Sequence, residues 1–112
     1  MAKIFSVTPI ELLEGVTGES FEAFWQNEYA PQGNLIGWTS HLVKADRGER
    51  AGKYAVIWEL PSVESRNRIV KEPGVLTEEG LKLLGPNFAK MNEKLNTFIR
   101  GWPFTDYIEL EP

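Results

Sequence analysis

The alternation of apolar and polar residues is clearest between positions 36 and 60. Two short runs in this stretch, 36–43 and 53–60, are rich in β-branched and aromatic residues and have no period near 3.6, so they predict two strands. The link between them, 45–52, carries charged residues and two glycines, which suits an exposed hairpin connection. We expect this hairpin to be the centre of the fold.

The residues before the hairpin predict one strand and one helix. Positions 4–12 form the strand, and Pro9 predicts that it lies at a sheet edge or carries a bulge, because proline cannot donate a ladder hydrogen bond. Thr17 suits the N-cap of a helix that ends near Ala30, where a proline follows, and positions 32–34 then predict a loop. The helix carries an apolar stripe made of Phe21, Phe24, Trp25 and Tyr29.

The residues after the hairpin predict several helices and a last strand. Ser62 suits the N-cap of a helix over 63–71, and Thr77 suits the N-cap of another. Apolar residues at helical spacing in 88–98 predict a longer helix, and the final strand is expected over 104–110.

The predicted order is strand, helix, two strands, helix, extra helices and strand, within a single domain that spans the whole chain. This is an α+β pattern of the ferredoxin-like, split-βαβ type, with a four-stranded antiparallel sheet and helices on one face. Tyr54, Val56 and Trp58 share one parity of the third strand, whereas Ala55 and Ile57 share the other, so both sheet faces are apolar. Because helices cover only one face, we expect a second copy of the chain to cover the other and to give a homodimer.

Composition removes several classes of function. The formal net charge of −4 argues against binding to nucleic acid or to an anionic membrane, since both need a basic surface. The chain has no cysteine, which excludes disulfides, thiolate catalysis and zinc–thiolate sites. The N-terminal residues predict no secretory signal, and no apolar run is long enough for a membrane span, so a cytoplasmic protein is expected.

The third strand and the capped helix after it, from Val56 to Ser65, resemble a known superfamily. Together with the strand order and the tryptophan-rich hairpin, they are similar to the dimeric α/β barrels. This group includes antibiotic-biosynthesis-type monooxygenases, haem-degrading monooxygenases, muconolactone isomerase and EthD-like proteins. The resemblance implies two ferredoxin-like subunits that pack sheet against sheet, and a pocket for a small hydrophobic molecule.

Two departures from the superfamily pattern point to a divergent branch. The monooxygenase branch often has a tryptophan two residues before the serine at position 62, where this chain has Leu60 and carries Trp58 two positions earlier. The haem-degrading branch uses a histidine after the second helix, and residues 63–96 contain none. Haem ligation at that position is therefore excluded, and no cofactor or metal is expected.

His41, the single histidine, is the candidate catalytic residue, because an imidazole in a dry pocket can act as a general base near neutral pH. The alternative is a histidine that is hydrogen-bonded within the sheet or at its edge. If Val43 pairs near Tyr54, His41 lies on the same sheet face as Trp58. His41 then enters a pocket on the face that the helices leave open. A register shift of one residue would instead place His41 under the helices or at the rim. The predicted pocket residues are Trp58, Tyr54, Val56, Trp38 and Tyr107.

Three roles stay open at this point. The first is a cofactor-independent monooxygenase or isomerase that acts on a small apolar substrate, with His41 as the base. The second is a dimer that binds a small hydrophobic ligand without chemistry, and the third is a structural or stress protein whose barrel is filled. A titratable group that faces an open cavity would favour the enzyme, whereas the structural role predicts no cavity.

Overall fold

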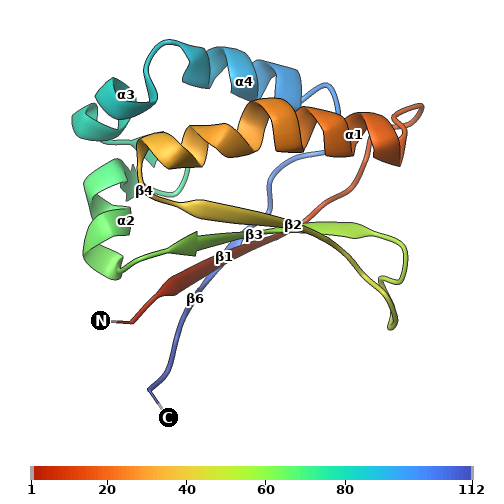
Figure 1. Ribbon diagram of the computed structural model, residues 1–112, viewed down its shortest axis with the longest axis horizontal. Helices are drawn as coiled ribbons and strands as arrows, with labels where there is room; N and C mark the ends of the chain where they lie inside the picture. The colour runs from red at the N-terminus through yellow and green to blue at the C-terminus, as the bar shows by residue number, and fades with distance from the viewer. Residues whose placement is uncertain (1, 112) are drawn as a thin grey trace.

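All helices lie on one face of a single main sheet, and the other face is left open (Figure 1). The computed structural model describes residues 2–111. The sheet is antiparallel and has four strands in the order β2-β3-β1-β6. The strands are β1 (Ile4–Pro9), β2 (Thr39–Lys44), β3 (Tyr54–Leu60) and β6 (Thr105–Ile108). The chain is thus an α+β protein with a four-stranded antiparallel sheet, as the sequence predicts.

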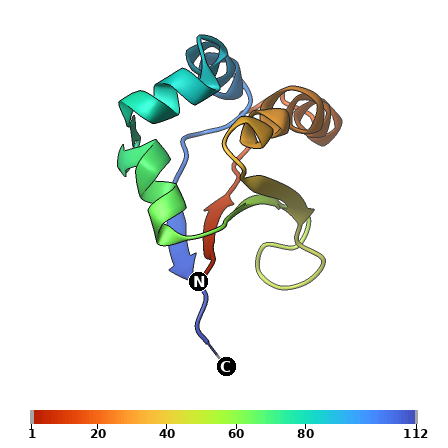
Figure 2. The same ribbon diagram turned by 60° about the vertical axis from the view of Figure 1, so that its left-hand side comes forward.

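The helical layer consists of four α-helices and two short helical segments of other types. The α-helices are α1 (Gly18–Phe24), α2 (Val63–Ile69), α3 (Glu78–Leu84) and α4 (Asn87–Leu95). The other segments are a π-helix, η1 (Trp25–Tyr29), and a 3₁₀-helix, η2 (Ala30–Leu35). A small hairpin that was not predicted, β4 (Val70–Glu72) with β5 (Val75–Leu76), joins α2 to α3 (Figure 2). Over the described range, every helix is too short or too polar to cross a membrane.

Side-chain hydrogen bonds start three of the helices, and they confirm the predicted caps. Thr17 accepts a hydrogen bond from the Ser20 backbone N–H, and Ser62 accepts one from the Ser65 N–H. Thr77 does the same for α3. Each hydroxyl satisfies one of the backbone donors that an α-helix leaves free in its first turn.

The region around Pro31 differs from the prediction of a helix end followed by a loop. The helical path continues through η1 and η2 as far as Leu35, so positions 32–34 are helical. Pro31 lies in the first turn of η2, where a missing N–H and a fixed φ are tolerated. This continuation carries Gln32 and Gly33 over the sheet.

Pro9 lies in a central strand whose register with β3 is continuous, so the prediction of an edge strand or a bulge at Pro9 is wrong. β1 pairs with β3 over its whole length, but its pairing with β6 ends at Val7 and Thr105. The Ile10 N–H donates to the Tyr54 carbonyl oxygen of β3 at 2.9 Å, so the nitrogen of Pro9 points to the side where β6 is already absent. The proline therefore removes no hydrogen bond from the sheet.

The register fixes which residues face the helices. His41 pairs with Ile57, and Ser40 pairs with Trp58, so His41 and Trp58 lie on opposite faces. Trp58 faces the helices together with Tyr54 and Val56. The core beneath α1 contains Val56 with Phe21, Phe24 and Trp25, and Val56, Phe21 and Trp25 have no exposed surface.

Candidate functional site

A cavity of about 450 Å³ lies between the helix-facing side of the sheet and the helices. Its floor comes from β1, β3 and β6, and its walls come from η2, α2, the β4–β5 hairpin, α3 and α4. Most of its lining is apolar: Ile36, Trp38, Trp58, Leu60, Ile69, Val70, Val75, Leu76, Leu84, Phe88, Leu95, Trp102 and Phe104. The cavity is partly open to solvent, and exposed residues such as Val75 stand in its lining, so a small molecule can enter it from outside.

One row of paired residues across the sheet explains why the floor is hollow. Ser40, Trp58, Ser6 and Asp106 stand next to one another on β2, β3, β1 and β6 and all face the helices. Trp58, Ser6 and Asp106 line the cavity. Ser6 is the smallest side chain of the three and stands between the two larger ones, so it leaves space above the centre of the sheet.

Tryptophan side chains form a connected group at one end of the cavity. The ring centroids of Trp38 and Trp58 are 6.4 Å apart and meet edge to face, and Trp58 meets Trp25 in the same way at 5.9 Å. Trp102 stacks on Trp25, with the ring centroids 5.8 Å apart. The indole N–H of Trp38 donates to the Ser65 hydroxyl at 3.4 Å, which ties this wall to α2. These contacts hold the indoles in place and leave faces of Trp38, Trp58 and Trp102 toward the cavity.

Gly33 allows η2 to approach the sheet closely at this wall. A Cβ atom at this position would lie 2.6 Å from the indole of Trp58 and would also collide with the backbone oxygen of Trp38. The carbonyl oxygen of Gly33 accepts hydrogen bonds from the N–H groups of Ile36 and Trp38, at 3.1 and 2.9 Å. The absence of a side chain at Gly33 thus positions two tryptophans.

Two polar groups from η1 and η2 lie at the helical wall. The Tyr29 hydroxyl donates a hydrogen bond to Oδ1 of Asn92 at 2.7 Å, and burial raises the pKa of Tyr29 to about 12, so it stays a donor at physiological pH. The side-chain amide of Gln32 is sealed from solvent, and neither its oxygen nor its nitrogen has a hydrogen-bond partner among residues 2–111. A sealed amide without partners carries a free-energy cost.

An ion pair lies in the cavity lining, on the β6 side of Ser6. The NH1 group of Arg66, on α2, lies 3.2 Å from Oδ2 of Asp106, on β6, and both side chains line the cavity. The two side chains are 30% and 23% exposed, so the pair is partly shielded but open to a small molecule. It is the charged group of the cavity lining.

His41 lies outside this cavity. It is on the open face of the sheet, where its side chain is 51% exposed and its Nε2 is 3.3 Å from Oε2 of Glu59. The prediction that His41 and Trp58 share a pocket is wrong, because Val43 pairs with Ala55 rather than with Tyr54. The prediction of a pocket on the open face beside Trp58 is wrong for the same reason: Trp58 faces the helices.

The other predicted pocket residues divide between the cavity, the core and the open face. Trp58 and Trp38 line the cavity. Val56 and Tyr54 are buried in the core under α1, and the Tyr54 hydroxyl donates a hydrogen bond to Glu22. Tyr107 pairs with Phe5 and is 56% exposed on the open face. Neighbouring residues of a strand point to opposite faces, which separates Tyr107 from Asp106.

Ser6, Gln32, Arg66 and Asn92 are cavity residues that sequence reasoning missed. The sequence held one signal for them, because the helix-facing parity of β1 carries Ser6 and Thr8 among apolar neighbours. A central strand with small polar residues on its inner face indicates either buried hydrogen bonds or a space to be filled.

No family model and no curated protein matches this chain.

Proposed function

We propose that this protein binds a small, flat and largely apolar molecule in the cavity between its sheet and its helices. The observation that carries this proposal is the cavity of about 450 Å³ walled by Trp38, Trp58 and Trp102. Pockets for small molecules are commonly about 300–1,000 Å³, mainly apolar, with a few polar groups that orient the ligand.

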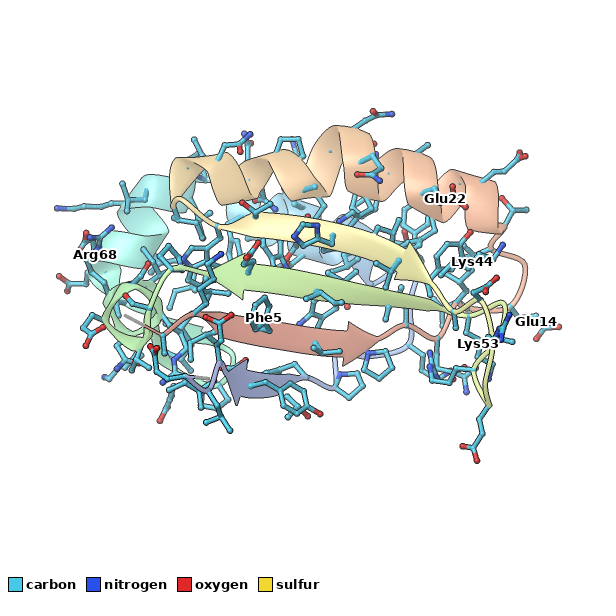
Figure 3. The ribbon with its side chains drawn as sticks, turned by 60° about the horizontal axis from the view of Figure 1, so that its bottom comes forward. Phe5, Glu14, Glu22, Lys44, Lys53 and Arg68 are labelled. Carbon is cyan, nitrogen blue, oxygen red and sulfur yellow. The ribbon has the colours of Figure 1, made fainter. Side chains whose placement is uncertain are left out.

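We further propose that the open face of the sheet packs against the same face of a second copy, as in a dimeric α/β barrel. The strand order β2-β3-β1-β6 is that of a ferredoxin-like sheet, which supports this arrangement. The face carries apolar side chains from all four strands, and Figure 3 shows Phe5 projecting from it. These side chains are Phe5, Val7, Val43, Ala55, Ile57 and Tyr107. The same face also carries the charged group made of Lys3, His41 and Glu59, but a row of apolar side chains across a whole sheet is typical of an interaction surface.

A second candidate function is catalytic, a cofactor-independent isomerase or monooxygenase. The specific observation in its favour is the carboxylate of Asp106 beside the guanidinium of Arg66 in the cavity floor. A carboxylate can accept a proton from a carbon next to a carbonyl group, while a guanidinium stabilises the enolate oxygen that forms. His41 does not serve this role because it lies on the other sheet face.

The ligand proposal is tested by narrowing the cavity without disturbing the core. Val75 lines the cavity and is 42% exposed, whereas Leu83 is 39% exposed on α3 outside the lining. Val75→Trp should weaken binding of 2-methylnaphthalene, measured by isothermal titration calorimetry, and Leu83→Trp should leave it unchanged. Absence of binding to the unmodified protein up to the solubility limit of the probe would refute the ligand proposal.

The dimer proposal is tested by placing a charge in the open face. Ile57→Lys should convert the dimer to a monomer in sedimentation velocity, because an unpaired ammonium group is costly to bury in an interface. Leu81→Lys, on an exposed position of α3, is the matched control and should stay dimeric. A monomeric unmodified protein at micromolar concentration would overturn this part.

The catalytic candidate has its own test. The α-protons of 2-tetralone, a bicyclic ketone, should exchange with deuterium faster in the presence of the protein, as followed by proton NMR. Asp106→Asn should return the exchange to the buffer rate, whereas His41→Asn should not change it. Equal exchange rates with and without protein would refute the catalytic candidate and would not affect the proposal of ligand binding.

A further inference from the structure

We propose that the Arg66–Asp106 ion pair recognises the polar end of the ligand and selects a neutral group that carries a hydrogen-bond donor and an acceptor side by side. A primary carboxamide is the simplest group of this kind. This inference rests on the proposed ligand function of the cavity and names the chemical class of that ligand.

The contact between the two side chains leaves part of each one free. NH1 of Arg66 meets Oδ2 of Asp106 at 3.2 Å, and Nε of Arg66 donates to Oδ1 of Asn67 at 3.2 Å. A guanidinium has five N–H donors and a carboxylate has two acceptor oxygens. Within the described part of the chain, NH2 of Arg66 and Oδ1 of Asp106 have no other side-chain partner. The pair therefore keeps one donor and one acceptor unused, on two side chains that both line the cavity.

The net charge of the pair decides which groups it accepts. An anionic ligand is attracted to Arg66 but repelled by Asp106. A cationic ligand is attracted to Asp106 but repelled by Arg66. Either ion also loses its hydration when it enters an apolar cavity, and this loss is expensive unless a full counter-charge receives it. A neutral amide gives its N–H to Asp106 and accepts from Arg66, so it satisfies both charges with hydrogen bonds to ionised groups, which are the stronger kind.

The place of the pair in the sheet sets the length of the ligand. Asp106 and Trp58 flank Ser6 on the neighbouring strands β6 and β3. Two strand spacings amount to about 10 Å, close to the length of a naphthalene ring with one attached polar group. The ring would lie over Ser6 against the indole of Trp58, and its polar group would reach Asp106.

The experiment compares four probes with the same aromatic body. The probes are 2-naphthamide, 2-naphthoate, 2-naphthylmethylammonium and 2-methylnaphthalene, and their dissociation constants are measured by isothermal titration calorimetry at neutral pH. We expect 2-naphthamide to bind about tenfold more tightly than 2-methylnaphthalene, and both ions to bind more weakly than the amide.

Two variants should invert the selectivity. Asp106→Asn keeps the shape of the side chain but leaves Arg66 as the unbalanced charge, so 2-naphthoate should become the preferred probe. Arg66→Met leaves Asp106 unbalanced and should make 2-naphthylmethylammonium the preferred probe. Glu64→Gln, on an exposed position of α2, is the control and should preserve the preference for the amide.

The outcomes separate this inference from the proposed function. If the four probes bind the unmodified protein equally, or if an ion binds best, the inference is wrong while the cavity still binds ligands. If no probe binds, the ligand function itself fails. Because the comparison of probes on the unmodified protein needs no substitution, the inference remains open to refutation even if a variant does not fold.

Discussion

Glu59 of β3 accepts a hydrogen bond from Nζ of Lys3 at 2.8 Å. The second oxygen of the same carboxylate lies 3.3 Å from Nε2 of His41, so this acid joins two bases on the open face. The hydrogen bond from Lys3, and next that from His41, lower the pKa of Glu59 below its ordinary value of 4.5. A carboxyl group whose pKa is lowered by folding stabilises the folded state at pH values above its ordinary pKa. This stabilisation is lost as the pH falls through the lowered pKa.

Substitution of Glu59 should therefore change stability at neutral pH but not in strong acid. The Glu59→Gln variant should unfold at lower urea concentration than the unmodified protein at pH 7, and the two curves should converge at low pH. Glu14→Gln, at an exposed turn, is the control and should leave the acid side of the stability curve unchanged. A constant gap between the Glu59 variant and the unmodified protein at every pH would contradict the linkage.

Tyr29 should make the protein sensitive to alkali. Its pKa is raised by burial from 10.0 to about 12, so between these values the unfolded chain releases this proton while the folded chain keeps it. Stability should fall as the pH rises through this range, by about 2 kcal/mol from this group. The hydrogen bond from Tyr54 to Glu22 raises the pKa of Tyr54, so Tyr54 acts in the same direction and must be separated by substitution.

The Tyr29→Phe variant provides that separation. At neutral pH it should be slightly less stable, since it loses the hydrogen bond to Asn92, and its stability should then fall less steeply above pH 10. Tyr107→Phe, on the exposed open face, is the comparison and should retain the steep fall. Parallel curves for Tyr29→Phe and the unmodified protein would mean that Tyr29 titrates normally.

Gln32 should be a position where an apolar substitution stabilises the fold. Both polar atoms of its amide are sealed without partners, and such a group costs about 1–3 kcal/mol. Gln32→Met keeps the length of the side chain and removes the amide, so the midpoint of thermal unfolding should rise by a few degrees. A lower midpoint would show that the amide makes a hydrogen bond in solution.

Trp25 and Trp58 should differ in their effects on stability and on binding. Trp25 is fully buried and also donates to the Ser40 hydroxyl at 3.2 Å, so Trp25→Ala should cost about 3–5 kcal/mol. Trp58 borders the cavity, so Trp58→Ala should cost less stability. Binding of 2-methylnaphthalene to this variant should weaken by about tenfold, which corresponds to ~1.4 kcal/mol of lost contact. Equal stability costs for the two variants, without a binding effect of Trp58→Ala, would favour a filled interior.

Local signals predicted much of the fold. The caps at Thr17, Ser62 and Thr77 are contacts between residues three apart, and a cap needs no knowledge of distant partners. The two strands of the central hairpin were likewise visible in short apolar runs. The place of Pro9 in the sheet was not predicted, because a proline is tolerated there only where the pairing of β1 with β6 has ended. β6 lies about a hundred positions later in the chain.

The site was harder to predict because it depends on register and on a gap between layers. A shift of one residue between β2 and β3 decides which sheet face His41 occupies, and a two-sided apolar strand gives no pattern to fix it. Arg66 and Asp106 lie 40 positions apart and meet only after α2 and β6 have packed. Their pairing is a property of the assembled layers.

The small side chain of Ser6 makes the space above the cavity floor recognisable from the amino-acid sequence. A chain of this fold with leucine or phenylalanine at this position would fill the space between Trp58 and Asp106, and one with serine, alanine or glycine would keep it. The size of this one side chain in a central strand thus decides whether a chain of this fold has an open or a filled space above the sheet. The same position is the natural place to reshape the cavity for a longer or shorter guest molecule.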